Sequence, residues 1–181
     1  MECAFQTDDY LYLVLEYCPG GELFFHLKKC KKIAEEIVKF YTASLVNALD
    51  YLHQNNVIFR DLKPENVLID KDGYAKLADF GLAKTGITES QLTHTFCGTA
   101  QYLAPEIIFK KPYGKAVDCW SLGCVIYQML VGEPPFVATE AGIKVLNDNI
   151  LNCRVNIPGN ISPQCQDLLR KIFVANPADR L

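Results

Sequence analysis

The chain has 181 residues, enough for one domain with a substantial core. Half of the residues are hydrophobic, 22% are charged and the net charge is −3, a balance that excludes a disordered chain. No basic run indicates nucleic acid or an anionic membrane as a partner, and no apolar stretch is long enough to span a membrane. Residues 1–4 lack the basic start and apolar core of a signal peptide, so we expect a cytoplasmic or nuclear location.

The sequence contains eight cysteines, an even number that is compatible with a disulfide framework. No two of them have C-x-x-C spacing, no zinc-type Cys/His spacing occurs, and the chain is not of the small secreted type. We therefore expect free thiols in a reducing compartment, with most of them acting as small core residues. The eight residues are Cys3, Cys18, Cys30, Cys97, Cys119, Cys124, Cys153 and Cys165.

One strand and two helices are predicted in the first 54 residues. Residues 10–17 (YLYLVLEY) form an apolar run rich in β-forming residues, which predicts a buried strand. A Cys-Pro-Gly-Gly turn separates it from a short helix predicted over residues 22–29. A long helix is predicted over residues 34–54, because apolar residues recur there three or four positions apart. That apolar face comprises Ile37, Tyr41, Leu45, Ala48, Leu49 and Leu52.

A β-hairpin and a long irregular segment are predicted next. Residues 67–69 and 74–77 are strand-like, and the Asp-Lys-Asp-Gly turn between them ends in a glycine that can adopt a positive φ. Residues 79–106 have mixed polarity, three glycines and many hydroxyl groups. A segment of this length inside a compact domain is usually functional.

The rest of the chain is predicted to be mostly helical. Residues 117–132 are apolar on nearly all sides, which predicts a buried helix that ends at a Gly-Glu-Pro-Pro sequence. Two more helices are predicted over residues 139–151 and 162–174, the second with Ser162 as its N-cap and a proline in its first turn. Because strands lie in the first 80 residues and helices dominate, the predicted fold class is α+β, mainly α.

The densest group of reactive side chains lies in Arg-Asp-Leu-Lys-Pro-Glu-Asn at residues 60–66, followed by Asp-Phe-Gly at residues 79–81. Phosphoryl transfer requires an oriented hydroxyl, magnesium and charge compensation on the phosphates. Asp61 is suited to orient the hydroxyl, and Lys63 to meet the phosphate as a point charge. Asn66 and Asp79 offer the oxygen ligands that Mg²⁺ prefers. Each residue alone is more simply explained as part of a solvated loop, but the two motifs together predict phosphoryl transfer.

With these motifs the chain resembles the protein serine/threonine kinases. Within them it is similar to the AGC group, in the Thr-Phe-Cys-Gly-Thr sequence at residues 95–99 and in residues 21–27 (GELFFHL), and it looks most similar to the serum/glucocorticoid-regulated and ribosomal-protein kinases. Phe59 departs from the His or Tyr of these kinases but keeps an aromatic ring to pack under the metal loop. The resemblance implies a partial kinase domain over residues 1–181. Residues 18–181 would form the large (C-terminal) lobe, and residues 1–17 a small-lobe remnant with the hinge strand.

The resemblance also implies an ATP site with Mg²⁺. The backbone at residues 16 and 18 would bind adenine, and Leu15 would lie at the back of the adenine pocket. The floor would be Leu68, and Glu22 would reach the ribose. The residues implied at this site are Glu16, Cys18, Glu22, Leu68 and Asp79, with Asn66 and Asp79 as the metal ligands.

The resemblance further implies a regulatory switch in the long irregular segment. Thr95 would be phosphorylated by an upstream activating kinase. A phosphate adds about −1.5 to −2 charge and would pair with Arg60, which orders the loop. Thr99 would help to fix Asp61 and Lys63.

Two structural contacts are implied between distant parts of the sequence. Glu106, in the Ala-Pro-Glu sequence that closes the segment, would pair with Arg180. Asp118 would accept backbone N–H groups of the catalytic loop, a structural rather than a chemical role.

The predicted substrates are proteins, and three departures concern the substrate site. Gln101 and Ala100 replace an expected Glu and Pro, and Gln128 stands where relatives that select basic substrates carry Glu. Glu65 and Glu22 remain available for basic side chains. We therefore expect a preference for Arg near the phosphoacceptor, weaker than in the cyclic-AMP-dependent kinase.

The largest departure from a kinase is an absence. The chain has no G-x-G-x-x-G sequence and no lysine before Lys28, and at Leu181 it stops before the family's final helix, so we expect a fragment or a truncated protein. Two function classes stay open: an active serine/threonine kinase through the parent sequence, and a catalytically silent remnant that acts as a binding or scaffold module. For this chain alone we expect an activity far below about 1 per second and an exposed apolar strand at residues 10–17.

Overall fold

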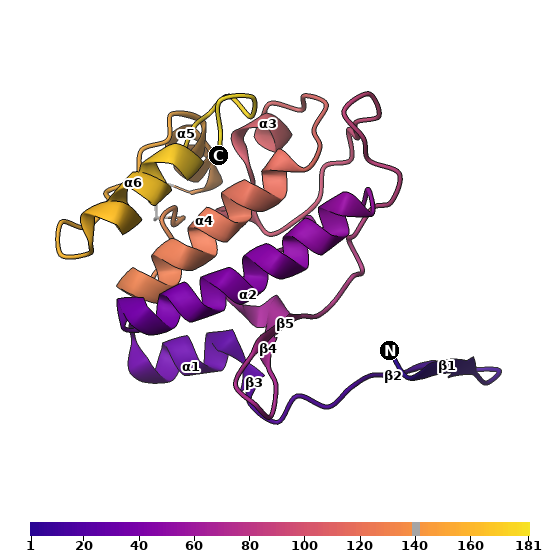
Figure 1. Cartoon of the computed structure of the whole chain (residues 1–181). Helices are drawn as coiled ribbons and strands as arrows, with labels where there is room; N and C mark the ends of the chain where they lie inside the picture. The colour runs from indigo at the N-terminus through magenta and orange to yellow at the C-terminus, as the bar shows by residue number, and fades with distance from the viewer. Residues whose placement is uncertain (139–141) are drawn as a thin grey trace.

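The computed structural model describes residues 1–138 and 142–181. A mainly helical body carries a small three-stranded sheet at one end, and a separate two-stranded hairpin extends away from it (Figure 1). The predicted class, α+β and mainly α, is confirmed.

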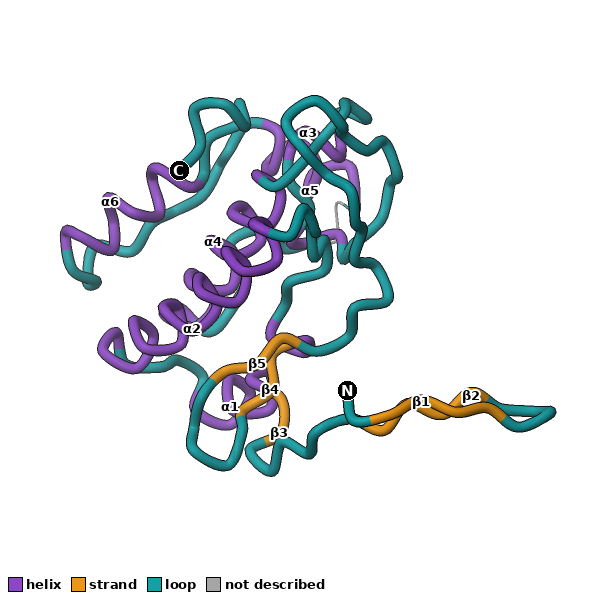
Figure 2. Tube along the Cα trace, turned by 45° about the vertical axis from the view of Figure 1, so that its right-hand side comes forward, coloured by secondary structure: helices purple, strands orange, loops and turns teal. Residues whose placement is uncertain are grey.

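Two long helices, α2 (Glu35–Gln54) and α4 (Ala116–Val131), lie side by side at the centre of the body (Figures 1 and 2). Nearly every residue of α4 is buried, as its uniformly apolar sequence predicts. Gly132 ends α4 with a φ of 100°, a left-handed conformation that favours glycine. A side chain at this position would also meet the backbone carbonyl of Lys31, so the glycine lets the connection between α1 and α2 pass close to α4.

Four shorter helices complete the body. The helices predicted over residues 22–29 and 162–174 are confirmed, and Ser162 caps the latter by accepting the N–H of Cys165 at 3.2 Å. The helix predicted over residues 139–151 is present from residue 143, and residues 139–141 lie outside the described part of the chain. The four are α1 (Leu23–Cys30), α3 (Pro105–Ile108), α5 (Ile143–Leu151) and α6 (Pro163–Ile172). No helix among the described residues is long and apolar enough to cross a bilayer.

The three-stranded sheet has the antiparallel order β3 (Gly21–Glu22), β4 (Val67–Ile69), β5 (Ala75–Leu77). The predicted hairpin is therefore confirmed, with Gly73 at a φ of 88° in its turn. A single 3-10 turn, η1 (Pro64–Asn66), leads directly into β4. The sheet therefore fixes the chain immediately after the 60–66 motif.

The prediction of a buried strand over residues 10–17 is wrong in its burial. β2 (Leu11–Val14) pairs with β1 (Cys3–Gln6) in a hairpin that projects from the body in both views (Figures 1 and 2). Leu11 is 79% exposed and Leu13 65%, because no other described strand or helix packs on them. The exposed apolar strand that the sequence led us to expect is present.

Burial on α2 differs from the predicted apolar face at one end. Leu45 and Leu49 are buried, as expected, but Ile37 is 49% exposed. Val38, the next residue, is buried instead, because the first turn of α2 directs Val38 rather than Ile37 toward the core.

All eight cysteines are free thiols, as predicted. The expectation that most of them lie in the core is wrong, because only Cys124 is buried and the other seven are partly or fully exposed.

The irregular segment at residues 79–106 is held by backbone bridges rather than by strands. Lys84 bridges to Ile58, before the catalytic motif, and Thr93 bridges to Tyr113. A short 3-10 turn, η2 (Ala100–Tyr102), precedes α3. The segment is thus attached near its start to the residues before the catalytic motif, and again at its middle to the residues before α4.

One contact joins α2 to α6 and makes stability depend on pH. The carboxylate of Glu35 accepts the hydroxyl and the N–H of Ser162, and these hydrogen bonds lower the pKa of Glu35 below its ordinary value. A lowered carboxylate pKa stabilises the fold above the unfolded-state pKa, and this contribution is lost as pH falls through the folded-state pKa.

We therefore expect Glu35→Gln to lower the thermal unfolding midpoint at pH 7, with the difference from the wild type shrinking as pH falls below about 4. Thermal melts across this pH range measure both effects. Glu36→Gln is the matched control, because Glu36 makes only an exposed pair with Lys39 and its loss should change little. An equal effect of the two substitutions would contradict the assigned contact.

Candidate active site

A buried carboxylate on α4 holds the chain at the start of the 60–66 motif. Asp118 is fully buried and accepts the N–H groups of Phe59 and Arg60 at 2.9 and 2.8 Å. His53 Nε2, near the end of α2, lies 2.8 Å from Asp118 Oδ2. Arg60 has a φ of 71°, which residues with side chains rarely adopt, and these bonds hold it there. The contact expected between Asp118 and the loop is present.

Asp61, Lys63, Asn66 and Thr99 form one hydrogen-bond network. The Thr99 hydroxyl donates to Asp61 Oδ1 at 2.8 Å and accepts from Lys63 Nζ at 2.9 Å. Lys63 Nζ also lies 2.9 Å from Asp61 Oδ2. Asn66 Nδ2 donates to the carbonyl and to the carboxylate of Asp61 at 2.8 and 3.0 Å, because η1 turns the chain back. The Asp61 carboxylate is therefore fixed from three directions.

The Asp-Phe-Gly sequence lies beside this network. The N–H of Ala78 donates to the carbonyl of Asn66 at 2.9 Å, which places Asp79 next to the end of the catalytic motif. Asp79 is exposed, has a φ of 61° and accepts the N–H of Gly81 at 3.0 Å. Phe80 packs edge-to-face on the fully buried Phe59 with ring centroids 5.2 Å apart, so the predicted aromatic contact under the metal loop is confirmed.

The residues assigned to ATP lie along the sheet. Glu22 and Leu68 are partners in the register between β3 and β4. Glu16 forms an ion pair with Lys76 on β5. Cys18, which precedes β3, is half-buried, whereas the side chain of Leu15 is 59% exposed. Leu68 is in turn the register partner of Lys76, and Asp79 follows two residues after the end of β5.

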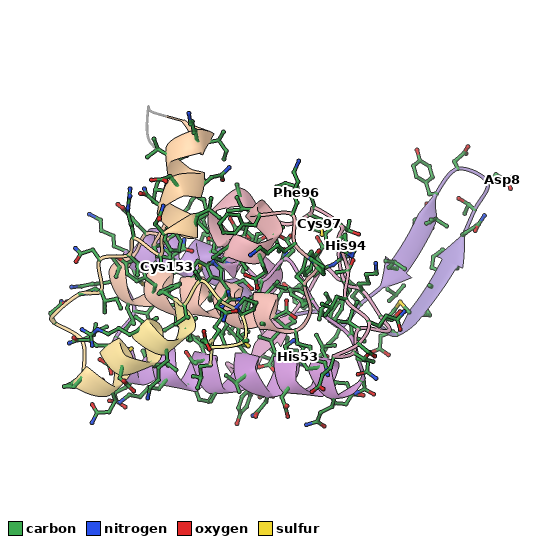
Figure 3. The ribbon with its side chains drawn as sticks, turned by 90° about the horizontal axis from the view of Figure 1, so that it is seen from above. Asp8, His53, His94, Phe96, Cys97 and Cys153 are labelled. Atoms are coloured by element: carbon green, nitrogen blue, oxygen red, sulfur yellow. The ribbon has the colours of Figure 1, made fainter. Side chains whose placement is uncertain are left out.

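Thr95 lies in an exposed loop with polar neighbours. Its hydroxyl is 3.4 Å from that of Thr93, which is buried and accepts from Lys84 Nζ at 2.9 Å. Figure 3 shows His94, Phe96 and Cys97 together on the same loop. The hydroxyl of Thr93 therefore lies between Thr95, where a phosphate would be attached, and the ammonium group of Lys84.

Arg60 reaches this loop indirectly. Its guanidinium donates to the carbonyl of Leu82 at 2.6 Å and to the Tyr113 hydroxyl at 3.3 Å. The Tyr113 hydroxyl donates in turn to the carbonyl of Thr95 at 2.6 Å. Burial raises the pKa of this hydroxyl, and the bonded Arg60 acts in the opposite direction. Tyr113 thus links Arg60 to Thr95 when Thr95 carries no phosphate.

Glu106 and Arg180 form a buried, bidentate ion pair, with both N–O distances 2.8 Å. The guanidinium also donates to the carbonyl of Ala116 at 2.9 Å and lies 5.1 Å from the ring of Trp120. The contact expected from the sequence is therefore present, and it ties the end of the irregular segment to α4 and to the end of the chain.

The substrate-site departures can be located as well. The Tyr102 hydroxyl donates to Gln128 Oε1 at 2.6 Å, so the glutamine amide group is engaged inside the body. Burial raises the pKa of Tyr102. Glu65 Oε2 is buried and has no hydrogen-bond partner among the described residues.

Sequence reasoning missed three residues of the site: His53, Lys84 and Tyr113. His53 and Tyr113 make contacts across more than fifty residues of sequence, which local spacing does not reveal. Lys84 contacts Thr93, nine residues further on in an irregular segment. The available signals were a histidine near the end of a long helix, and a lysine three residues after Gly81.

Comparisons with known proteins agree with this geometry. Residues 1–181 match the family described as "Protein kinase domain". Serine/threonine-protein kinase Sgk2 of Homo sapiens is 46% identical over 98% of this chain and 48% of its own length. Ribosomal protein S6 kinase beta of Caenorhabditis elegans is 48% identical over 98% of this chain and 32% of its own length. RAC-beta serine/threonine-protein kinase A of Xenopus laevis is 45% identical over all of this chain and 37% of its own length.

The chain therefore belongs to the protein kinase domain family, and its curated relatives are kinases of the AGC group. It spans less than half the length of each of these three relatives. The resemblance inferred from the two motifs is confirmed.

We expect Arg180→Met to reduce the free energy of unfolding by about 3–5 kcal/mol, because it leaves the Glu106 carboxylate buried without its partner. Urea unfolding at pH 7 measures the loss. The double variant Glu106→Gln/Arg180→Met should recover much of it, since no unpaired charge remains. Arg170→Met, at an exposed position on α6, is the control. A double variant as unstable as the single one would show that packing around Arg180, rather than the ion pair, stabilises this region.

Proposed function

We propose that this chain supplies the catalytic and metal-binding residues for ATP-dependent phosphorylation of Ser or Thr in protein substrates, as part of a kinase. The observation that carries the proposal is the network around Asp61. Three side chains from two distant segments orient this carboxylate while it remains partly accessible. Such preorganisation is what phosphoryl transfer requires of a protein.

Each member of the network has a role that its chemistry supports. Asp61 would accept or orient the proton of the substrate hydroxyl. Lys63, held beside it by Thr99, would compensate charge on the transferring phosphate. Thr99 would set the separation of the two. We assign Asp61, Lys63 and Asn66 as the catalytic set.

The chain also offers a fitting set of ligands for Mg²⁺. The amide nitrogen of Asn66 is engaged with Asp61, which leaves the amide oxygen as the ligand atom. Asp79 adds an exposed carboxylate beside it. These two ligands fit Mg²⁺, which is otherwise held by phosphates and water. Among the described residues, no group of three or more His, Cys, Asp or Glu side chains could hold a metal ion. Bound Mg²⁺ would neutralise charge on the ATP phosphates.

ATP would lie along the edge formed by the sheet. We assign the backbone of Glu16 and Cys18 to adenine, Leu68 to the adenine floor and Glu22 to the ribose. In this division residues 1–17 belong to the hinge and small lobe, and residues 18–181 to the large lobe. We place the activity in the cytoplasm or nucleus.

Protein substrates with a basic side chain near the phosphoacceptor fit the acidic groups on this surface. Glu65 carries a buried oxygen without a described partner, and such a group gains most from a donor supplied by a ligand. Glu22 is exposed at the start of α1. Gln128 supplies no charge, so we propose a moderate preference for Arg.

Thr95 is the proposed switch, and an upstream kinase would phosphorylate it. The added charge would attract Lys84 and Arg60, both of which already bind groups next to Thr95. The loop that carries Thr99 would then be held more firmly against Asp61.

A second function remains open, in which the chain is a catalytically silent binding or scaffold module. The observation that favours it is the exposed apolar hairpin β1–β2. The two functions differ in whether a longer protein that contains this chain transfers phosphate through Asp61.

We expect Asp79→Asn to remove the Mg²⁺-dependent part of ATP binding, while Asp61→Asn leaves it intact. Asp61→Asn should lower the rate of peptide phosphorylation by at least about 100-fold, because it removes the group that handles the hydroxyl proton. Calorimetric titration with and without Mg²⁺, and a phosphate-transfer assay on an Arg-containing peptide, measure the two effects. Asp72→Asn, in the exposed turn before β5, is the matched control. The transfer assay is made on the full-length parent that contains this chain. Equal binding loss in both site variants would contradict the roles, and no measurable transfer by the wild-type parent would favour the silent module.

A further inference from the structure

The outer face of α1 and the residues after it carry a dense positive charge. Four of the 18 Lys and Arg residues in the chain, whose net charge is −3, lie within five positions: Lys28, Lys29, Lys31 and Lys32. All four are exposed, and none forms an ion pair with a described carboxylate. We call these lysines together with Phe25 the α1 patch.

The packing of α1 explains why the patch faces outward. Leu23 and Leu27 are buried against the body and Phe24 and His26 are half-buried, so Phe25 and residues 28–30 are the exposed part of the helix. Phe25 is 62% exposed, and it shares a helix face with Lys28 and Lys29, three and four positions later. An aromatic side chain and several lysines thus lie on one unpartnered surface.

A purely structural role accounts for only part of the charge. Lysines in the last turn of a helix interact favourably with its dipole, which explains Lys28 and Lys29. Lys28 Nζ also lies 4.4 Å from the centre of the Phe24 ring. Lys31 and Lys32 follow the end of the helix and have no such partner among the described groups.

We propose that the α1 patch binds the surface of an anionic lipid membrane. Clusters of four or more lysines on an amphipathic helix suit a diffuse negative surface, and an exposed aromatic residue adds a shallow apolar anchor. An acidic protein partner fits less well, because the patch contains no arginine for bidentate binding of carboxylates. A run of five residues is too short to predict membrane binding from the sequence alone. The fold shows in addition that the lysines are exposed and that Phe25 lies on the same helix face.

Sedimentation with lipid vesicles tests the proposal on the complete 181-residue chain. We expect binding to vesicles that contain phosphatidylserine and none to vesicles of phosphatidylcholine alone. Raising the salt concentration should weaken binding, because the attraction is electrostatic. Lys29→Gln/Lys32→Gln should weaken it about thirtyfold, and Phe25→Ser should weaken it further.

The control is Lys110→Gln/Lys111→Gln, which removes another exposed lysine pair beside an exposed aromatic ring, that of Phe109. It should leave vesicle binding unchanged. Equal loss in both double variants, equal binding to neutral vesicles, or tighter binding to poly-glutamate or duplex DNA than to the anionic vesicles would overturn the proposal. Because the patch is outside the Asp61 network, its failure would leave the proposed phosphoryl transfer untouched.

Discussion

The candidate site depends on one buried carboxylate, that of Asp118. It binds two consecutive backbone N–H groups at residues 59 and 60 and lies within hydrogen-bond distance of His53. Without these bonds, the positive φ of Arg60 would be strained and two buried donors would lose their acceptor. Since Asp61 is the next residue, the backbone that carries it is held from α4, an element more than fifty residues away in the sequence.

The same helix anchors the other end of the irregular segment. Arg180 binds Glu106 and the carbonyl at the start of α4, while Thr99 reaches across to Asp61. The segment that holds the proposed phosphorylation site is therefore held at several points, and Thr95 itself is exposed between them. The proposed phosphorylation at Thr95 would take place four residues before Thr99, which donates to Asp61.

Much of this was predictable from sequence because it depends on local pattern. The helices follow from apolar periodicity, the β4–β5 hairpin from its turn, and the family from two short motifs. The errors arise where burial depends on distant partners. The apolar sequence of β2 predicts burial, but no other described strand or helix packs on it. Ile37 was predicted to be buried, but its neighbour Val38 faces the core instead. His53 and Tyr113 were missed because their contacts cross more than fifty residues of sequence.

Amide hydrogen exchange is the most direct test of the claim that Asp118 fixes the catalytic loop. In the wild-type chain the N–H groups of Phe59 and Arg60 should be as well protected as those in the middle of α4. In Asp118→Asn, which keeps the shape but removes one acceptor, these two amides should exchange faster while the middle of α4 stays protected. Unchanged protection at both amides, in a variant that remains folded, would contradict the account.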